Sequence, residues 1–353
     1  MNNVFPVRLK QARLMRGLSM DALSAKMGGA GLSKQSICKY EKGKMMPDSR
    51  SLITLADALD VSIDYLFRPI KCTIDSFEFR KKSSLGTKKI GSIKETIKDK
   101  LERYIEIEKL LLLNTECNLS ERYGNVEVMS ESDVYNLSQK LRNDWKLGED
   151  GLSNLIEVLE DNHIKVIEID NDKHFDGLSG YVNKSIPVIV LNDCFSNERR
   201  RFTALHELGH LVLAFSPNIE DKRKERMCDL FASELLISKE TFMRLLGSNR
   251  RDISLQELIA IQRQFGISID ALMYKARQLN IITERRYTTF CKRKNTLPDF
   301  KAEVEKGRTG KEHSDRFIRL VYRALADEQI SISKASELLG KNIDDVRDTI
   351  NLV

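Results

Sequence analysis

The segment from His206 to His210 carries residue types that could hydrolyse a peptide bond with the help of a metal ion. Its sequence is His-Glu-Leu-Gly-His. Residues four positions apart point the same way on an α-helix, so the imidazoles of His206 and His210 can bind one metal ion together. Glu207 lies beside them, where its carboxylate can take a proton from an attacking water. The segment therefore predicts a zinc site with Glu207 as the catalytic base, although an ordinary amphipathic helix could carry the same five letters.

A second acidic segment, Glu225–Leu236, supplies candidates for the third zinc ligand. A catalytic zinc needs three protein ligands and one open position. Glu225 and Asp229 are four residues apart and share one helical face. We expect Glu225 to bind the metal and Asp229 to hold the outer N–H of a histidine. Glu234 is the fallback ligand, and a solvated acidic helix face is the alternative interpretation.

Apolar periodicity predicts the elements that would position these side chains. The stretch from Asn197 to Phe215 contains no proline and repeats apolar residues at helical spacing, which predicts a helix for the first motif. Three segments are typical of β-strands, and the last two would pair antiparallel: Lys165–Ile169, Leu178–Val182 and Pro187–Leu191. Helical patterns occur before and after them, at Val134–Trp145, Leu152–Leu159 and Leu255–Leu279. Together they predict an α+β domain.

The two motifs together resemble those of the ImmA/IrrE family of bacterial metallopeptidases. The resemblance rests on Arg201–His210 and Glu225–Leu236, and it extends over roughly Glu131–Asn280. This chain departs from the family at Leu235–Ser238, where a Leu-Leu-Met-Pro-like sequence is usual. The resemblance implies a gluzincin-like peptidase with a single zinc that cleaves a repressor or antitoxin and so switches on stress or mobile-element genes.

The resemblance also implies how a substrate is held. In gluzincin-like enzymes a sheet edge above the zinc binds the substrate as an added strand, and Leu178–Asn183 would be that edge here. Tyr181 on this strand is a candidate for stabilising the negatively charged oxygen of the transition state. The alternative interpretation is that the Tyr181 side chain only packs.

The amino-terminal region, residues 4–68, predicts a separate domain of five short helices. Ser19 and Ser33 are typical helix N-caps, and a glycine-rich loop lies between the second and third helices. Two helices joined by such a turn are the helix-turn-helix arrangement. Over this whole range the sequence resembles the DNA-binding domains of the Xre and phage-repressor family, including Tyr40–Gly43 and Leu55–Leu66.

The third helix of this domain carries side chains that could read DNA. Those that could enter the major groove are Ser33, Lys34, Gln35, Ser36 and Lys39. Those better placed to contact phosphate are Arg13, Lys42 and Lys44. The alternative interpretations are a solvated helix face and a protein–protein module. The expected partner is a double-stranded DNA operator, and because helix-turn-helix domains usually bind two-fold sites as dimers, we also expect a homodimer.

The positive charge of the chain is concentrated in its amino-terminal 100 residues. Residues 1–100 contain 20 Lys and Arg against 10 Asp and Glu, and the other residues contain 38 against 42, which gives the net charge of +6. Basic excess in one domain indicates a polyanionic partner for that domain. DNA binding there should depend strongly on salt.

Composition and length indicate a folded cytoplasmic protein. The chain has 353 residues, 41% of them apolar, which is enough for two compact domains. We expect no signal peptide, because the first residues lack an apolar core, and no membrane span, because the longest apolar runs are too short. Six cysteines are scattered without a C-x-x-C pair, so we expect reduced thiols and neither disulfides nor a cysteine metal site.

These observations predict a mainly α-helical chain with a small β-sheet, of the α+β class, in four parts. The parts are a helix-turn-helix domain at 1–68, a linker with a long helix at 69–130, a gluzincin-like zinc peptidase domain at 131–285 and a C-terminal helical accessory region at 286–353. The long helix could be a rigid spacer or a dimer contact. The C-terminal region contains a second helix-turn-helix-like element, for which contact with DNA or a repressor is one interpretation.

The predicted function is that of a DNA-binding zinc metalloendopeptidase that cleaves a repressor or antitoxin. One Zn²⁺ per chain is expected, and the ligand types are also compatible with Mn²⁺ or another divalent ion. Two alternatives belong to other classes. The chain could be a regulator whose peptidase-like domain senses a ligand without cleaving, or one component of a toxin–antitoxin-like pair.

Overall fold

The chain is described by a computed structural model that covers residues 4–27, 32–70, 77–79, 87–114, 117, 119–169, 175–310 and 312–350. The described residues form two compact units. Unit 1 takes its residues from 1–75, 83–115 and 315–353, and unit 2 takes its residues from 76–82 and 116–314. Helices dominate and the sheets are small, which confirms the predicted α+β class.

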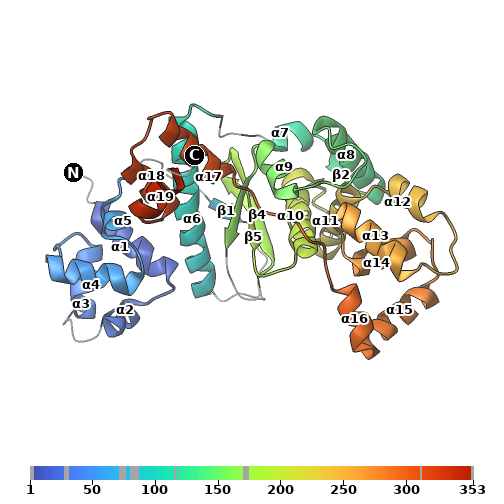
Figure 1. Ribbon diagram of the computed structural model, residues 1–353, viewed down its shortest axis with the longest axis horizontal. Helices are drawn as coiled ribbons and strands as arrows, with labels where there is room; N and C mark the ends of the chain where they lie inside the picture. Colours follow the sequence, from blue (N-terminus) through green and yellow to red (C-terminus); the bar gives the residue numbers. More distant parts are fainter. Residues whose placement is uncertain are drawn as a thin grey trace. The chain divides into compact units, whose positions relative to one another are not determined.

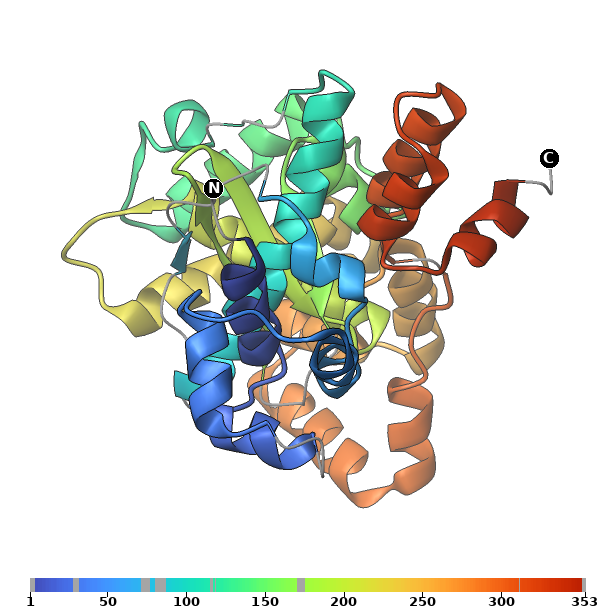
Figure 2. The same ribbon diagram turned by 90° about the vertical axis from the view of Figure 1, so that its left-hand side faces the viewer.

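Five short helices form the amino-terminal part of unit 1, as predicted. They are α1 (Val4–Met15), α2 (Met20–Lys26), α3 (Lys34–Glu41), α4 (Ser49–Leu59) and α5 (Ile63–Phe67), drawn in blue in Figures 1 and 2. Each helix after the first begins at a side chain that accepts a backbone N–H left free by the helix end, namely Ser19, Ser33, Asp48 and Ser62. The core between the helices is apolar and fully buried, with Leu9, Leu23, Ile37, Leu55 and Leu59 at its centre. The predicted glycine-rich loop lies outside the described residues.

A long helix, α6 (Thr87–Leu110), packs against α1 within unit 1 (Figure 1). Acidic side chains of α6 pair with arginines of the five-helix part. Arg8 Nη1 lies 2.6 Å from Glu102 Oε2, and Arg68 pairs with Asp99. Both arginine side chains are almost completely buried, so losing either carboxylate would leave an uncompensated charge inside the protein. The long helix that was expected in a linker therefore packs as part of unit 1.

Three C-terminal helices also belong to unit 1. They are α17 (Arg316–Ala326), α18 (Ile332–Leu339) and α19 (Ile343–Ile350). Polar contacts hold them on α6. Lys334 Nζ lies 2.9 Å from Glu106 Oε1, Arg103 Nη1 donates to the Leu338 carbonyl at 3.0 Å, and Arg316 Nη1 donates to the Tyr104 hydroxyl at 3.0 Å. The helix-turn-helix-like element predicted in this region is thus packed on the helix that follows the amino-terminal domain.

The predicted accessory region at 286–353 is consequently divided between the two units. Its first helices, α15 (Glu284–Thr296) and α16 (Pro298–Val304), contribute Phe290 and Val304 to the apolar core of unit 2. Its last helices pack in unit 1. The sequence gives no local signal for this division, because both halves are amphipathic helices and only their distant partners differ.

The buried carboxyl group of Asp99 predicts how the stability of unit 1 depends on pH. Burial alone would raise the pKa of Asp99, but the guanidinium groups of Arg103 and Arg68 outweigh burial and hold the pKa below its ordinary value. A carboxyl group of this kind stabilises the fold above its unfolded-state pKa of about 3.9. That stabilisation is lost as the pH falls through the lower folded-state pKa.

We therefore expect Asp99→Asn to lower the free energy of local opening of α6 near neutral pH. The difference from the unsubstituted chain should shrink below about pH 4, where Asp99 itself becomes neutral. Amide hydrogen exchange of α6 over a pH series measures both quantities. The matched control is Asp344→Asn, since that carboxylate is 85% exposed. A difference that stays constant across the series would contradict the assignment.

The larger sheet of unit 2 has four strands in the order β1-β4-β5-β3. The strands are β1 (Phe77–Phe79), β3 (Lys165–Ile169), β4 (Gly177–Val182) and β5 (Ile186–Asn192). β4 and β5 form the predicted antiparallel hairpin, with Val182 opposite Ile186, and β3 pairs parallel with β5. Asn183 and Lys184 in the turn have positive φ angles of 49° and 63°. Asn tolerates this left-handed backbone better than most residues, which explains its place in the turn.

The strand predicted as a free substrate-binding edge is covered over part of its length. β1 pairs antiparallel with β4, and the ladder ends with Phe79 opposite Gly180. Within the described ranges, only the beginning of β4, Gly177–Ser179, lacks a strand partner on this side. The prediction of Leu178–Asn183 as one continuous edge is therefore wrong, because a strand from far earlier in the chain occupies half of it.

Helices pack against this sheet and build most of the core of unit 2. They are α7 (Leu119–Tyr123), α8 (Glu131–Asp144), α9 (Leu155–Asp161), α10 (Asn197–Val212), α11 (Asp221–Leu236), α12 (Lys239–Leu246), α13 (Leu255–Phe265) and α14 (Ile269–Gln278). A short parallel pair, β2 (Glu127–Val128) and β6 (Ala214–Phe215), completes the unit. α10 packs against β4, β5 and α11, as Figure 1 shows. None of the helices in the described part of the chain is long and apolar enough to cross a membrane.

Candidate functional site

The helices α10 and α11 come into close contact at Gly209. A Cβ atom at this position would lie 3.3 Å from Phe231 Cδ1 and 3.4 Å from Cys228 Cα, so a larger side chain would push the two helices apart. Ser196 caps the start of α10 by accepting the backbone N–H of Arg199. The glycine inside the His-Glu-Leu-Gly-His motif therefore allows the two predicted motifs to meet.

The three predicted ligand residues, His206, His210 and Glu225, are brought together where these helices meet. One ligand atom from each lies within 4.8 Å of the others. The Glu225 carboxylate spans the two imidazoles: Oε2 lies 3.2 Å from His206 Nε2 and Oε1 lies 3.4 Å from His210 Nε2. Two imidazole nitrogens and a carboxylate oxygen are the donor set of many single-zinc peptidase sites. The residues present fit such an ion.

The outer nitrogen of each histidine has its own partner on α11. His206 Nδ1 lies 2.8 Å from Asp229 Oδ1, where we expected Asp229 to hold a histidine. His210 Nδ1 lies 3.4 Å from Cys228 Sγ, a contact that the sequence analysis missed. Because Asp229 and Cys228 contact the Nδ1 atoms, the Nε2 atoms of both rings face Glu225. This arrangement presents the Nε2 lone pairs to a metal ion when each Nδ1 carries its proton.

Replacing Asp229 with alanine is expected to lower zinc affinity by a factor of about 10–100, because His206 loses the partner that fixes its ring and tautomer. Competition with a zinc chelator of known affinity measures the change. Asp221→Ala is the matched control, since Asp221 lies in the first turn of the same helix and its side chain is 95% exposed. Equal zinc affinity in the two variants would show that Asp229 does not support the ligand.

Glu207, the predicted catalytic base, lies on α10 beside the beginning of β4. The hydroxyl of Ser179 donates a hydrogen bond to Glu207 Oε2 at 2.7 Å. A Cβ atom at Gly177 would lie 2.6 Å from Thr203 Cγ2 and 3.4 Å from Glu207 Cγ, so only glycine lets the strand approach the helix so closely. The sequence analysis missed both Gly177 and Ser179. Strand alternation was the available signal, since residues 177, 179 and 181 share one face of β4.

Tyr181 is bonded to the main chain of α10. Its hydroxyl donates to the Leu211 carbonyl at 3.3 Å, and the ring packs against the core of unit 2. These contacts fit the alternative interpretation, in which the Tyr181 side chain packs. The contact gives the strand a second attachment to α10, one helical turn beyond Glu207, and we assign Tyr181 no catalytic role.

Glu234, the fallback ligand, lies in a buried ion pair outside the cluster of His206, His210 and Glu225. Glu234 Oε1 lies 2.6 Å from Lys275 Nζ in a buried pair, and Oε2 accepts the backbone N–H of Lys239. Burial lowers the pKa of Lys275, and Glu234 opposes that effect. Nine helical residues separate Glu234 from Glu225, which is two and a half turns, so the two carboxylates point to opposite sides of α11. Glu234 therefore cannot reach the two histidines together with Glu225 in this structure.

The recognition helix α3 exposes most of the side chains predicted to reach DNA. Ser33 is its N-cap, and the Ser33 and Ser36 hydroxyls are 3.2 Å apart. Lys34 is exposed and pairs with Asp21 at 2.8 Å. The other predicted side chains, all exposed, are Gln35, Lys39, Lys42 and Lys44. These residues lie along α3 and the turn that follows it, so a DNA groove could contact them together.

Arg13 is buried and paired with Glu41, whereas the prediction placed it on the surface for contact with phosphate. Its guanidinium is buried and forms a double hydrogen bond with Glu41, at 2.5 and 2.9 Å, and it also donates to the Leu18 carbonyl. The side chain thus fixes α1 to the end of α3. Sequence reasoning placed it outside because its acceptor is 28 residues away.

Two segments of the chain match known protein families. Residues 159–277 match the IrrE N-terminal-like domain, and residues 9–66 match the helix-turn-helix family. An uncharacterized HTH-type transcriptional regulator, YqaE of Bacillus subtilis (strain 168), is 32% identical over 65 residues, which is 18% of this chain and 53% of the relative. The SPbeta prophage-derived uncharacterized HTH-type transcriptional regulator YonR of the same organism is 33% identical over 72 residues, 20% of this chain and 64% of the relative. The chain thus spans between half and two thirds of the length of these relatives.

Proposed function

We propose, because this chain joins a helix-turn-helix domain to an IrrE N-terminal-like domain, that it is a transcriptional regulator and also a zinc-dependent metalloendopeptidase. The observation that carries the proposal is the cluster of His206, His210 and Glu225 with ligand atoms within 4.8 Å of one another. All three residues lie inside the range that matches the IrrE-like domain. The proposed substrate is a repressor or antitoxin protein, and the proposed DNA partner is an operator.

The three ligand side chains would hold the zinc, and when bound the ion would supply Lewis acidity for the scissile carbonyl and for water. Mn²⁺ suits the same donors, so metal analysis of the purified protein decides between them. Asp229 and Cys228 keep both imidazoles oriented toward Glu225 through their contacts with the outer nitrogens.

Glu207 would transfer the protons of the reaction. Its carboxylate accepts a proton from the attacking water and returns it to the leaving amine, which is general base and then general acid catalysis. The Ser179 hydroxyl, 2.7 Å from Glu207 Oε2, keeps the carboxylate in place during both transfers. An extended segment of the partner would pair with the main chain of Gly177–Ser179, the part of β4 that β1 leaves uncovered.

The helix-turn-helix domain would bring the peptidase to its target. Gln35 can make a bidentate contact with adenine, and exposed lysines of α3 can contact guanine or phosphate. Joining both activities in one chain raises the local concentration of the peptidase near a repressor bound at the same operator. A two-fold operator would bind two copies of the chain.

Two substitutions distinguish a side chain that recognises a DNA base from one that contacts phosphate. Gln35→Ala is expected to cost about 1–3 kcal/mol at one base position, whereas Lys42→Gln should weaken binding to all sequences and reduce the salt slope by about one. Fluorescence anisotropy, with duplexes that the protein selects from a random library, measures both at several salt concentrations. The control is Lys109→Gln on α6, because that side chain is exposed and lies outside the amino-terminal helices. A uniform loss for Gln35→Ala would contradict its assignment as a reader.

The proposed cleavage is tested by comparing the proteins of cells that produce the unsubstituted chain with those of cells that produce Glu207→Gln. One polypeptide should become shorter only in the first. Glu220→Gln is the matched control, since Glu220 is exposed and its side chain makes no capping hydrogen bond at the start of α11. Shortening of the same polypeptide in the Glu207→Gln cells would contradict the proposal.

A regulator that does not cleave is the second candidate function. The observation in its favour is that both curated relatives are named as transcriptional regulators. The same cells decide between the two candidates. Normal regulation by Glu207→Gln, with no shortened polypeptide in any of the cells, would support the regulator without peptidase activity.

A further inference from the structure

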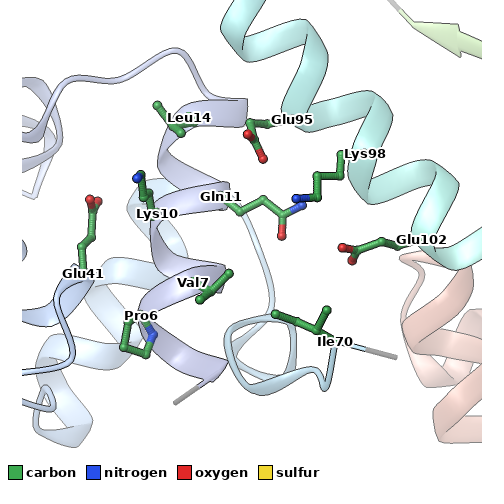
Figure 3. Close-up of a pocket in the computed structure, with 10 residues that line it drawn as sticks. All are labelled: Pro6, Val7, Lys10, Gln11, Leu14, Glu41, Ile70, Glu95, Lys98 and Glu102. Atoms are coloured by element: carbon green, nitrogen blue, oxygen red, sulfur yellow. The ribbon is translucent and has the colours of Figure 1, made fainter. Parts of the chain in front are cut away.

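Unit 1 contains a cavity of about 510 Å³ between α1, the end of α3 and the middle of α6 (Figure 3). Gln11 from α1 and Lys98 from α6 point toward each other across it. Val7 and Ile70 lie on the same side of the cavity, and both are exposed, by 51% and 38%. The cavity is therefore lined both by hydrogen-bond donors and by apolar side chains.

Gln11 presents an unused hydrogen-bond donor to this cavity. The residue is only 6% exposed, and its Oε1 accepts a hydrogen bond from Arg8 Nη1 at 2.7 Å. Because a guanidinium can only donate, this contact fixes which end of the amide is oxygen. The other end, Nε2, has no hydrogen-bond partner in the described part of the chain. A buried N–H without an acceptor is costly, so native proteins seldom keep one without a ligand, water or ion.

Lys98 adds a second donor opposite the first. No ion pair involving its ammonium group is formed among the residues that the structure describes. Two donors that face each other, an amide N–H and an ammonium, cannot satisfy one another. An acceptor placed between them would satisfy both, and an oxygen anion suits both donors.

The charges around the cavity permit an anion despite the acidic residues that line it. Glu102 pairs with Arg8, and Glu41 pairs with Arg13, so two of the three lining carboxylates are already neutralised. The third, Glu95, is outnumbered by the two lysines that line the same cavity. When the two paired glutamates are left out, the side chains that line the cavity carry a net charge of +1.

We propose that this cavity binds a small organic anion, a carboxylate with a short apolar chain. The carboxylate oxygens accept from Gln11 Nε2 and Lys98 Nζ, and the chain covers the exposed Val7 and Ile70. A ligand in this position bridges α1 of the helix-turn-helix domain and α6. Since Arg13 of α1 holds Glu41 at the end of the recognition helix, the ligand lies close to the element that would read DNA. By linkage, any effect of the anion on DNA affinity equals the effect of DNA on anion affinity.

Isothermal titration of the full chain with hexanoate, acetate and inorganic phosphate tests the proposal. Hexanoate should bind saturably and at least tenfold more tightly than acetate, and phosphate should not compete with it at equal concentration. Unsaturable hexanoate binding, equal affinities for the two carboxylates, or tighter binding of phosphate would each overturn the proposal. The metal centre takes no part in these titrations, so their outcome is independent of the proposed peptidase activity.

Two variants connect binding to the residues named. Gln11→Glu keeps the size of the side chain and the oxygen that Arg8 requires, and it replaces the donor with a negative charge. Lys98→Met removes the ammonium from a partly exposed position and keeps the aliphatic stem. Each should weaken hexanoate binding at least tenfold, with Lys109→Met on the exposed end of α6 as the control. Hexanoate affinity that is unchanged in a folded Lys98→Met variant would overturn the proposal even if Gln11→Glu failed to fold.

Discussion

Glu207→Gln is expected to slow cleavage of the protein partner by a factor on the order of 10²–10⁴, the usual contribution of a positioned acid or base. Glutamine keeps the size of the side chain and can still contact the Ser179 hydroxyl, but it cannot accept the proton from water. The measurement is the rate at which purified chain shortens the polypeptide identified in the cellular comparison.

Metal content is the internal control for this prediction. Glu207 is not among the three clustered ligand residues, so the variant should bind as much zinc as the unsubstituted chain. A rate within about tenfold of the original, with zinc still bound, would remove Glu207 from the role of proton carrier, since that loss lies below the range expected of an acid or base. Loss of zinc in the variant would show instead that the residue helps to hold the metal.

Arg201→Met is expected to destabilise unit 2 by about 3–5 kcal/mol, the usual effect of breaking a buried ion pair by removing one partner. Arg201 lies on α10, five residues before His206, and its side chain is fully buried. Its Nη1 lies 2.6 Å from Glu312 Oε2, and Nη2 donates to the Leu152 carbonyl at 3.1 Å. Burial lowers the pKa of Arg201, and Glu312 opposes that effect. Methionine would leave the Glu312 carboxylate buried without it.

The same helix offers the control for Arg201→Met. Arg199 pairs with Asp176 at 2.6 Å, but both side chains are about half exposed, so Arg199→Met should cost less than about 1 kcal/mol. Denaturant unfolding followed by tryptophan fluorescence reports on unit 2 alone, because Trp145 is the only tryptophan in the sequence and packs against the core of that unit. Equal losses of unfolding free energy in the two variants would mean that the buried Arg201–Glu312 pair does not stabilise α10 and its surroundings.

The elements and ligand residues that sequence analysis identified depend on short-range patterns. The five amino-terminal helices follow from caps and apolar spacing, and the β4–β5 hairpin follows from two apolar runs around an Asn-Lys turn. His206 and His210 meet because one helical turn brings them together, whatever the rest of the fold does. Glu225 and Asp229 share a helical face for the same reason, so each reaches a histidine from α11.

The contacts that sequence analysis missed or misassigned join residues far apart in the chain. Arg13 looked like a surface cation because nothing near it in sequence neutralises it, yet Glu41 does so across the fold. Ser179 holds Glu207 only because β4 crosses α10 at a glycine. The packing of α6 and the C-terminal helices depends on ion pairs with sequence separations that no periodic pattern encodes. Local periodicity therefore identified the three clustered donors and Asp229 but not Cys228 or Ser179, which contact His210 and Glu207.

The zinc content of the purified full chain tests the central claim most directly. We expect one zinc per folded chain, and we expect it to be lost in Glu225→Ala while Glu220→Ala, five residues earlier and exposed, retains it. Circular dichroism confirms that each variant is folded. A folded, unsubstituted chain without stoichiometric metal after incubation with zinc, or full retention of zinc by Glu225→Ala, would contradict the account.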